Sequence, residues 1–303
     1  MKVSINNISK NYQNSKALDL VSLTVPSGSI YGLLGPNGAG KTSLIRILTQ
    51  ITKQDDGEIF FDDELLSPHH TKLIGYLPEE RGLYKKMTVG EQLLFFGQIK
   101  GLGLVEAKKE LKKWGEKLEI MSWLPKKTEE LSKGMQQKVQ FIATVINNPK
   151  LLILDEPFSG FDPINAQIII NEIKELNKNG TTIIFSTHRM ESVELLCNYI
   201  GLINKSKVVL DGAVNEIKNH YKLNQYKICF LNENLAENEF YDIISFSKHE
   251  KTAVIKPKTL MSNKDLIGCL LNQDVELTNF EEMVPAIEEI FIHAVKNLST
   301  QLN

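Results

Sequence analysis

The chain has 303 residues, of which 42% are hydrophobic and 24% charged, and its formal net charge is −2. This composition is typical of a soluble globular protein of about two domains, and the near-neutral charge argues against a large nucleic-acid-binding surface. No apolar stretch approaches the ~18–20 residues needed to span a bilayer, and the N-terminus has no apolar signal core, so we expect a cytosolic chain.

The first 34 residues are predicted to form strands. Residues 3–5 and 20–25 alternate apolar and polar side chains, residues 26–28 form a turn, and residues 30–34 read as a buried strand. Further along, residues 43–49 suit a helix and residues 57–61 another strand.

The segment between the buried strand and this helix carries the strongest motif, G-x-x-x-x-G-K-[ST]. Its glycines let backbone N–H groups wrap around phosphate oxygens, while Lys41 supplies a positive charge and Thr42 a hydroxyl ligand for Mg²⁺. The order strand, loop and helix makes a chance glycine-rich turn a poor alternative. The predicted nucleotide-binding residues of this loop are Gly35, Pro36, Asn37, Gly38, Ala39, Gly40, Lys41, Thr42 and Ser43.

From about 87 to 148 the pattern becomes helical, which indicates a helical insertion. Within it, Ser132 is a good N-cap for a long helix, and Gly134 allows close backbone approach. Such a helix N-terminus can bind an anion. By itself, the segment fits an ordinary capped helix equally well.

Residues 151–154 are a fully apolar strand followed by two adjacent carboxylates, Asp155 and Glu156. At this edge of a parallel sheet, Asp155 is placed to hold Mg²⁺ and Glu156 to act as general base toward a water molecule. Both can serve one site only where the backbone turns after the strand. The alternative is a strand end with solvated acids.

A second buried strand, residues 181–186, leads to His188 at the same edge, where an imidazole can contact a γ-phosphate and the attacking water. Residues 168–177, between these two strands, have helical periodicity. Apolar strands that alternate with helices predict a largely parallel sheet covered on both faces. The other histidines lack such a setting and are assigned to surface or packing roles: His69, His70, His220, His249 and His293.

The composition shifts near residue 220. Strand patterns at 226–231 and 252–255 and helical patterns at 266–271 and 285–296 predict a small α+β domain over 221–303, after a first domain over 1–220. The cysteines, Cys197, Cys229 and Cys269, form no C-x-x-C pair, which favours reduced thiols over a metal site or a disulfide.

Together these motifs resemble the ATP-binding subunits of ABC transporters over residues 1 to about 220. The matching segments are Walker A (35–43), the signature segment (131–137), Walker B with its glutamate (151–156), the D-loop (159–162) and the switch histidine, His188. Residues 221–303 resemble the extra domain of some ATPase subunits of ABC-2-type exporters, and residues 78–84 are similar to the sodium- and drug-efflux subfamily.

The resemblance implies a P-loop NTPase core with a RecA-like sheet, an antiparallel β subdomain and a helical subdomain (about 87–148), followed by the α+β domain. It also implies that two ATPase domains pair head to tail around ATP and Mg²⁺. Lys41, Thr42, Asp155, Glu156 and His188 would act on the ATP bound to their own chain. Three residues would act across the interface or at it: Ser132, Gly134 and Asp162.

Two further residues take roles from the resemblance. Tyr12 lies where the family stacks an aromatic ring on adenine, and Glu79 takes the place of the Q-loop glutamine, where its carboxylate can reach Mg²⁺ or water. In the signature segment, Lys133 and Met135 replace the usual glycine and glutamine, which removes a polar contact.

The implied partners are a transmembrane permease subunit and a second ATP-binding subunit, identical or not, with no nucleic acid. The implied location is cytoplasmic, peripheral on the inner face of the cell membrane. The main alternative is a soluble ABC-type ATPase that acts as a conformational clamp on the ribosome or DNA. A single P-loop, the absence of sustained heptads and the overall charge argue against it. A degenerate regulatory nucleotide binder would conflict with the intact set of site residues.

Overall fold

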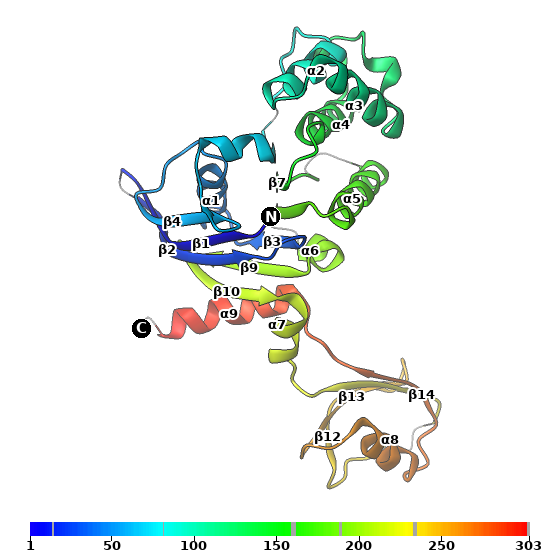
Figure 1. Ribbon diagram of the computed structural model, residues 1–303. Helices are drawn as coiled ribbons and strands as arrows, with labels where there is room; N and C mark the ends of the chain where they lie inside the picture. Colours follow the sequence, from blue (N-terminus) through cyan, green and yellow to red (C-terminus); the bar gives the residue numbers. More distant parts are fainter. Residues whose placement is uncertain (14, 81, 159–161, 188–189, 233–234, 302–303) are drawn as a thin grey trace. The chain divides into compact units, whose positions relative to one another are not determined.

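The computed structural model describes residues 1–13, 15–80, 82–158, 162–187, 190–232 and 235–301. The chain divides into two compact units (Figure 1), Met1–Val214 together with Ala294–Asn303, and Asn215–His293. The sequence places the boundary between two domains at residues 220 and 221, and this boundary stays a prediction. In the structure, the last residues of the chain group with the first unit.

The first unit is built on a six-stranded sheet in the order β10-β9-β3-β8-β7-β6, which is parallel from β9 to β6, with β10 antiparallel to β9. Every residue of β3, β7 and β8 is buried, as expected for a sheet covered on both faces. The strands are β3 (Ile30–Leu34), β6 (Ile74–Leu77), β7 (Leu151–Asp155), β8 (Thr182–Thr187), β9 (Tyr199–Asn204) and β10 (Lys207–Ala213).

A second, antiparallel sheet has the order β2-β1-β4-β5. Its strands are β1 (Val3–Tyr12), β2 (Ser15–Val25), β4 (Asp56–Phe61) and β5 (Glu64–Leu65). β1 and β2 are longer than the sequence pattern predicted, because the alternation of buried and exposed residues breaks at register shifts along the pair. One hydrophobic core joins this sheet, helix α1 (Lys41–Leu48) and the central sheet.

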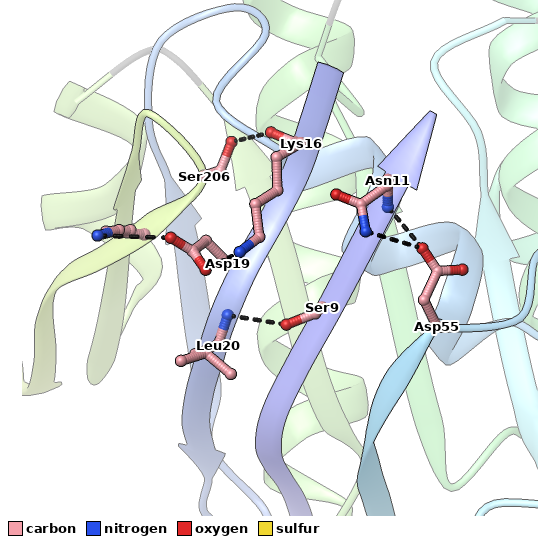
Figure 2. A network of polar contacts seen from close by, with 8 residues as sticks. Ser9, Asn11, Lys16, Asp19, Leu20, Asp55 and Ser206 are labelled. Carbon is pink, nitrogen blue, oxygen red and sulfur yellow. Dashed lines mark hydrogen bonds and ion pairs between the residues drawn. The ribbon is translucent and has the colours of Figure 1, made fainter. Parts of the chain in front are cut away.

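Polar contacts fix the outer end of the β1–β2 hairpin (Figure 2). Figure 2 shows the Asn11 N–H donating to the Asp55 carboxylate at 2.7 Å. The Lys10 ammonium donates to the same carboxylate at 2.6 Å. The Leu20 N–H donates to Ser9 Oγ at 3.2 Å, where the ladder between the two strands is irregular. These contacts satisfy backbone groups that the ladder leaves free.

The predicted helical insertion contains α2 (Val89–Ile99), α3 (Leu104–Lys117) and α4 (Lys133–Val145), with the 3₁₀ turns η2 (Met121–Trp123) and η3 (Thr128–Glu130). These helices gather in one group (Figure 1). Helix α2 begins with a capping box between Thr88 and Glu91. The buried Trp114 ring lies edge-on to Phe141, with ring centroids 6.0 Å apart.

The remaining helical elements of the first unit connect the sheet strands. They are the 3₁₀ helix η1 (Pro68–Leu73), α5 (Pro163–Lys178) and α6 (Met190–Leu196). Within the described residues, no helix has both the length and the apolar character required to cross a membrane. All three cysteines are free thiols in the structure, Cys197 buried and Cys229 and Cys269 half-buried.

The second unit is an α+β fold with the sheet order β12-β13-β11-β14. Helix α8 (Asn263–Leu271) lies beside this sheet (Figure 1) and contributes Leu266 and Leu270 to a separate hydrophobic core. The strands are β11 (Tyr226–Phe230), β12 (Tyr241–Ser247), β13 (Thr252–Pro257) and β14 (Leu277–Glu282). Two helices link the units along the chain, α7 (Val214–His220) and α9 (Ile287–Gln301).

Candidate functional site

A cavity of about 360 Å³ lies at the carboxyl edge of the central sheet. It brings together the glycine-rich loop, Glu79, and the two carboxylates at the end of β7, Asp155 and Glu156, which are far apart in the sequence. The lining residues are Ala17, Asn37, Gly38, Ala39, Gly40, Lys41, Thr42, Ser43, Glu79, Asp155 and Glu156. A different cavity, of about 270 Å³ between α3 and α5, contains none of the predicted site residues.

The loop joins β3 to α1 and packs tightly against its surroundings. A Cβ on Gly40, which has a φ of 116°, would lie 2.4 Å from the Ala17 carbonyl oxygen. A Cβ on Gly35, which has a φ of 148°, would lie 2.1 Å from the carbonyl oxygen of Ile203. Only glycine fits these two positions, and the loop therefore has one defined path around the cavity.

Lys41 is the first residue of α1, and its side chain turns back over the loop. Its ammonium donates to the carbonyl oxygens of Gly35 at 2.7 Å and Pro36 at 3.1 Å. Burial lowers the pKa of Lys41, while the nearby carboxylates of Glu156 and Asp155 act in the opposite direction. The loop thus holds a cation beside the N-terminus of a helix, where an anion is favoured.

Asp155 is only 3% exposed and ends β7. Burial raises the pKa of its carboxyl group, and the hydroxyl of Ser186, which donates to that carboxylate, opposes the rise. Glu156 follows with a φ of 48°, so the chain turns directly after the strand. The Thr187 hydroxyl donates to Glu156 Oε2 at 3.3 Å. The neighbouring strand β8 therefore orients both carboxylates.

The sequence interpretation did not identify Ser186 and Thr187 as part of the site. Their signal was present, because two hydroxyl residues follow the apolar run of residues 183–185 in a strand that pairs in parallel with β7. The register places Ser186 directly opposite Asp155, but the sequence does not give that register.

Ser206 is a second residue that the sequence did not indicate. It lies in the β9–β10 turn, where its N–H donates to the Ala39 carbonyl at 3.2 Å. Its hydroxyl donates to the Lys16 carbonyl at 2.5 Å (Figure 2), and its own carbonyl accepts the Asp19 N–H at 2.8 Å. One turn therefore connects the glycine-rich loop to the β1–β2 hairpin.

Glu79 follows β6 and lines the cavity. The segment around it is held from α4, because the buried Gln140 amide donates to the Pro78 carbonyl at 3.5 Å and the Glu80 carbonyl at 3.4 Å. Gln140 was not identified from the sequence, where it reads as one more polar residue of a helix.

Ser132 is the N-cap of α4, as predicted, and its hydroxyl accepts the Met135 N–H at 3.3 Å. Gly134 lies in open space: apart from its chain neighbours and the backbone of its own helical turns, no heavy atom of the described residues lies within 4 Å of the position that a Cβ would take. Neither residue lines the cavity of its own chain.

Asp162 is the N-cap of α5 and accepts the N–H groups of Ile164 and Asn165, both at 3.0 Å. These hydrogen bonds lower the pKa of Asp162. Tyr12 ends β1, is 38% exposed and lies near the Lys10 ammonium, 5.6 Å from its ring centroid. Neither Asp162 nor Tyr12 lines the cavity, and His188 lies outside the described residues.

Comparison with known families gives three matches along the chain, one of which is to an AAA domain family (putative AbiEii toxin, Type IV TA system) over residues 127–194. The ABC transporter family matches residues 18–159. The C-terminal domain of DrrA1-3-like ATP-binding proteins matches residues 212–295.

Individual relatives agree with the ABC transporter match. An uncharacterised ABC transporter ATP-binding protein of Bacillus subtilis, YhaQ, is 38% identical over 301 residues, which cover 97% of this chain and 98% of that protein. The linearmycin resistance ATP-binding protein LnrL of the same organism is 34% identical over 214 residues, covering 70% of this chain and 69% of LnrL. Nothing in these similarities supports a clamp on the ribosome or DNA.

Solved structures show the same fold. The structure of an ATP-binding subunit of an ABC transporter aligns with a TM-score of 0.68 at 26% identity, covering 73% of this chain and 93% of that one. The predicted α/β fold with parallel and antiparallel sheets is confirmed. The chain belongs to the ATP-binding subunits of ABC transporters, a family of ATPases.

Proposed function

We propose that the chain binds Mg²⁺-ATP in the 360 Å³ cavity and hydrolyses it there to drive a membrane permease. The transport that this permease carries out would be export. The observation that carries the proposal is that a single cavity joins the glycine-rich loop, Lys41, Asp155 and Glu156. Phosphate oxygens would accept hydrogen bonds from the backbone N–H groups of the loop and from the Lys41 ammonium.

The oxygen atoms of Thr42, Asp155 and Glu79 would hold Mg²⁺. All three residues line the cavity, and hard oxygen ligands are those that Mg²⁺ prefers. The buried Asp155 carboxylate suits this role, because its burial disfavours an uncompensated charge and a cation would compensate it. The ion supplies charge neutralisation on the phosphate oxygens.

Glu156 would act as the general base that accepts a proton from the attacking water. The turn at Glu156 directs its carboxylate into the same cavity as Asp155, and Thr187 donates a hydrogen bond that orients it. His188 would contact the γ-phosphate and the water, and Lys41 would stabilise the charge that develops during phosphoryl transfer.

A second ATP-binding subunit, identical or related, would complete each site. Ser132 and Gly134 do not line the cavity of their own chain, and the space beside Gly134 leaves room for a phosphate bound to another subunit. Asp162 would transmit changes across this interface, and Tyr12 would stack on adenine. The two subunits would close around the γ-phosphate and separate when hydrolysis removes it. This cycle of closure and opening would perform work on the permease.

The permease would dock beside Glu79 and the helical block 87–130, on the cytoplasmic side of the membrane. In support, this block exposes the apolar side chains of Ile99, Leu104 and Val105. Charge reversal at this surface should uncouple hydrolysis from transport in the intact transporter, and unchanged coupling would count against the assignment.

Lys41→Ala tests the nucleotide site itself. Removing the ammonium should weaken binding of a fluorescent ATP analogue by about tenfold or more, since hydrogen bonds to charged groups are each worth roughly 1.5–3 kcal/mol. Lys53→Ala, a change outside the cavity lining, is the matched control and should bind like the unmodified chain. Equal affinity in the two variants would refute the proposed role of the loop lysine.

A further inference from the structure

A cluster of two histidines and a glutamate lies outside the nucleotide cavity, at the corner where β5 leads into η1. Glu64 belongs to β5, and His69 and His70 are consecutive residues of η1. One ligand atom from each residue lies within 4.8 Å of the other two. None of the three lines the nucleotide cavity.

The distances within the cluster fit a shared metal ion better than direct hydrogen bonds. Glu64 Oε2 lies 3.4 Å from His69 Nε2 and 3.5 Å from His70 Nε2, whereas N–H···O hydrogen bonds span about 2.7–3.2 Å. With bonds of about 2.0–2.1 Å, two ligands of a tetrahedral Zn²⁺ ion lie roughly 3.3 Å apart. Both observed separations are close to that value.

Ser67, just before η1, contacts the far nitrogen of both rings. Its hydroxyl lies 2.6 Å from His69 Nδ1, and its carbonyl oxygen lies 3.3 Å from His70 Nδ1. The Ser67 N–H also lies 3.2 Å from His70 Nδ1 and donates to it when that nitrogen is unprotonated. A metal ion at both Nε2 atoms requires the other tautomer, in which each Nδ1 carries the proton and donates it to the Ser67 hydroxyl or carbonyl oxygen. Ligands of a metal ion commonly have their second nitrogen held in this way.

The position of the His70 ring is also fixed by packing. The residue is 3% exposed, and its ring meets Phe61 edge-on at a centroid distance of 5.2 Å. Glu64 and His69 are exposed, with side chains 72% and 64% accessible. The cluster thus combines one rigid buried ligand with two ligands that solvent and a metal ion can reach.

We propose that Glu64, His69 and His70 form a binding site for a divalent transition-metal ion, with Zn²⁺ as the best match and water as the fourth ligand. Two imidazoles and one carboxylate suit Zn²⁺, whereas Mg²⁺ prefers oxygen ligands alone. The ion would clamp β5 to η1, the segment that precedes β6 and Glu79. The proposal does not depend on the proposed function of the nucleotide cavity.

The test is Zn²⁺ binding to the full-length chain after removal of metals with a chelator. Isothermal titration with Zn²⁺ in excess Mg²⁺, which occupies the oxygen-rich nucleotide site, should show one site per chain. Glu64→Gln and His69→Ala change exposed side chains and should each weaken Zn²⁺ binding by about tenfold or more. His249→Ala removes an exposed histidine of the other unit and should leave the affinity unchanged.

Thermal unfolding provides an independent readout, because a ligand that binds only the folded state raises the melting temperature. Zn²⁺ should raise it for the unmodified chain and for His249→Ala, but much less for Glu64→Gln and His69→Ala. Ser67→Ala should keep the site but weaken binding about tenfold.

Co²⁺ substitution reports the geometry, since tetrahedral Co²⁺ absorbs visible light far more strongly than octahedral Co²⁺. The proposal predicts an intense band that Glu64→Gln and His69→Ala reduce and His249→Ala retains. Equal Zn²⁺ affinity in the unmodified chain, Glu64→Gln and His69→Ala would overturn it, as would a loss of equal size in His249→Ala.

Discussion

At the scale of single residues, the site depends on partners that lie on the neighbouring strand. Asp155 is buried, and the hydroxyl of Ser186 donates to its carboxylate from β8. The sequence predicts site roles for Asp155 and Glu156 because acids at the end of an apolar strand are a local pattern. It could not identify Ser186 or Gln140, because their roles depend on which elements pack together.

Ser186→Ala removes the hydroxyl that orients Asp155. We expect Mg²⁺ to support ATP hydrolysis about tenfold less effectively, because loss of a group that positions a metal ligand typically costs 10–100-fold in affinity or activity. The measurement is steady-state turnover against Mg²⁺ concentration at saturating ATP.

The matched control for this change is Ser29→Ala. It also removes a buried serine hydroxyl, which donates to the Pro26 carbonyl at 2.6 Å, away from the cavity. A Mg²⁺ dependence that shifts equally in both variants would show that Ser186 has only a structural role.

At the scale of elements, the core strands were the most predictable part of the chain. β3 matches its predicted range, and β7 and β8 match theirs to within one residue, because each contains an uninterrupted run of buried residues. β12 and β14 were missed, since their burial alternates irregularly on an edge of the second sheet. β9 and β10 were missed as well, although the turn between them supports the glycine-rich loop.

The contacts of Asp55 with β1 predict a pH-dependent contribution to stability. The Lys10 ammonium and the Asn11 N–H lower the pKa of Asp55 in the folded chain. Its contribution is therefore fully present above the unfolded value of about 4 and is lost as the pH falls through the lower folded value. Asp55→Asn should unfold at lower urea concentration than the unmodified chain at neutral pH, and the gap should shrink on acidification below about pH 4.

Asp63→Asn in the β4–β5 turn is a suitable control for this experiment, because surface changes of this kind alter stability little. A difference between Asp55→Asn and the unmodified chain that stays constant over the whole pH range would contradict the electrostatic origin of the effect.

At the scale of the whole molecule, the second unit has a hydrophobic core of its own, centred on fully buried residues such as Leu266 and Tyr241. The composition shift near residue 220 is the basis of the predicted division at residues 220 and 221, whereas the second unit of the structure begins at Asn215. That shift could not predict that the last residues group with the first unit, because that grouping depends on long-range contacts.

Leu266→Ala should lower the stability of the second unit by about 2–5 kcal/mol, the range for a leucine truncated in a core. In calorimetry we expect one transition to move to lower temperature while a second transition, and ATP binding, stay unchanged. Leu260→Ala, at a position 99% exposed in the same unit, is the control. A common shift of the whole unfolding curve would show that the two units unfold together.

The central claim is that two subunits close around ATP, with Gly134 of each facing the nucleotide of the other. Sedimentation velocity of Glu156→Gln, in which hydrolysis is blocked, tests it most directly. The account predicts a monomer without ATP and a dimer with Mg²⁺-ATP. When Gly134→Ala is added, it predicts a monomer in both conditions. The added methyl group has open space within its own chain, so a loss of the dimer would come from the interface. A Glu156→Gln chain that binds Mg²⁺-ATP and sediments as a monomer would contradict it.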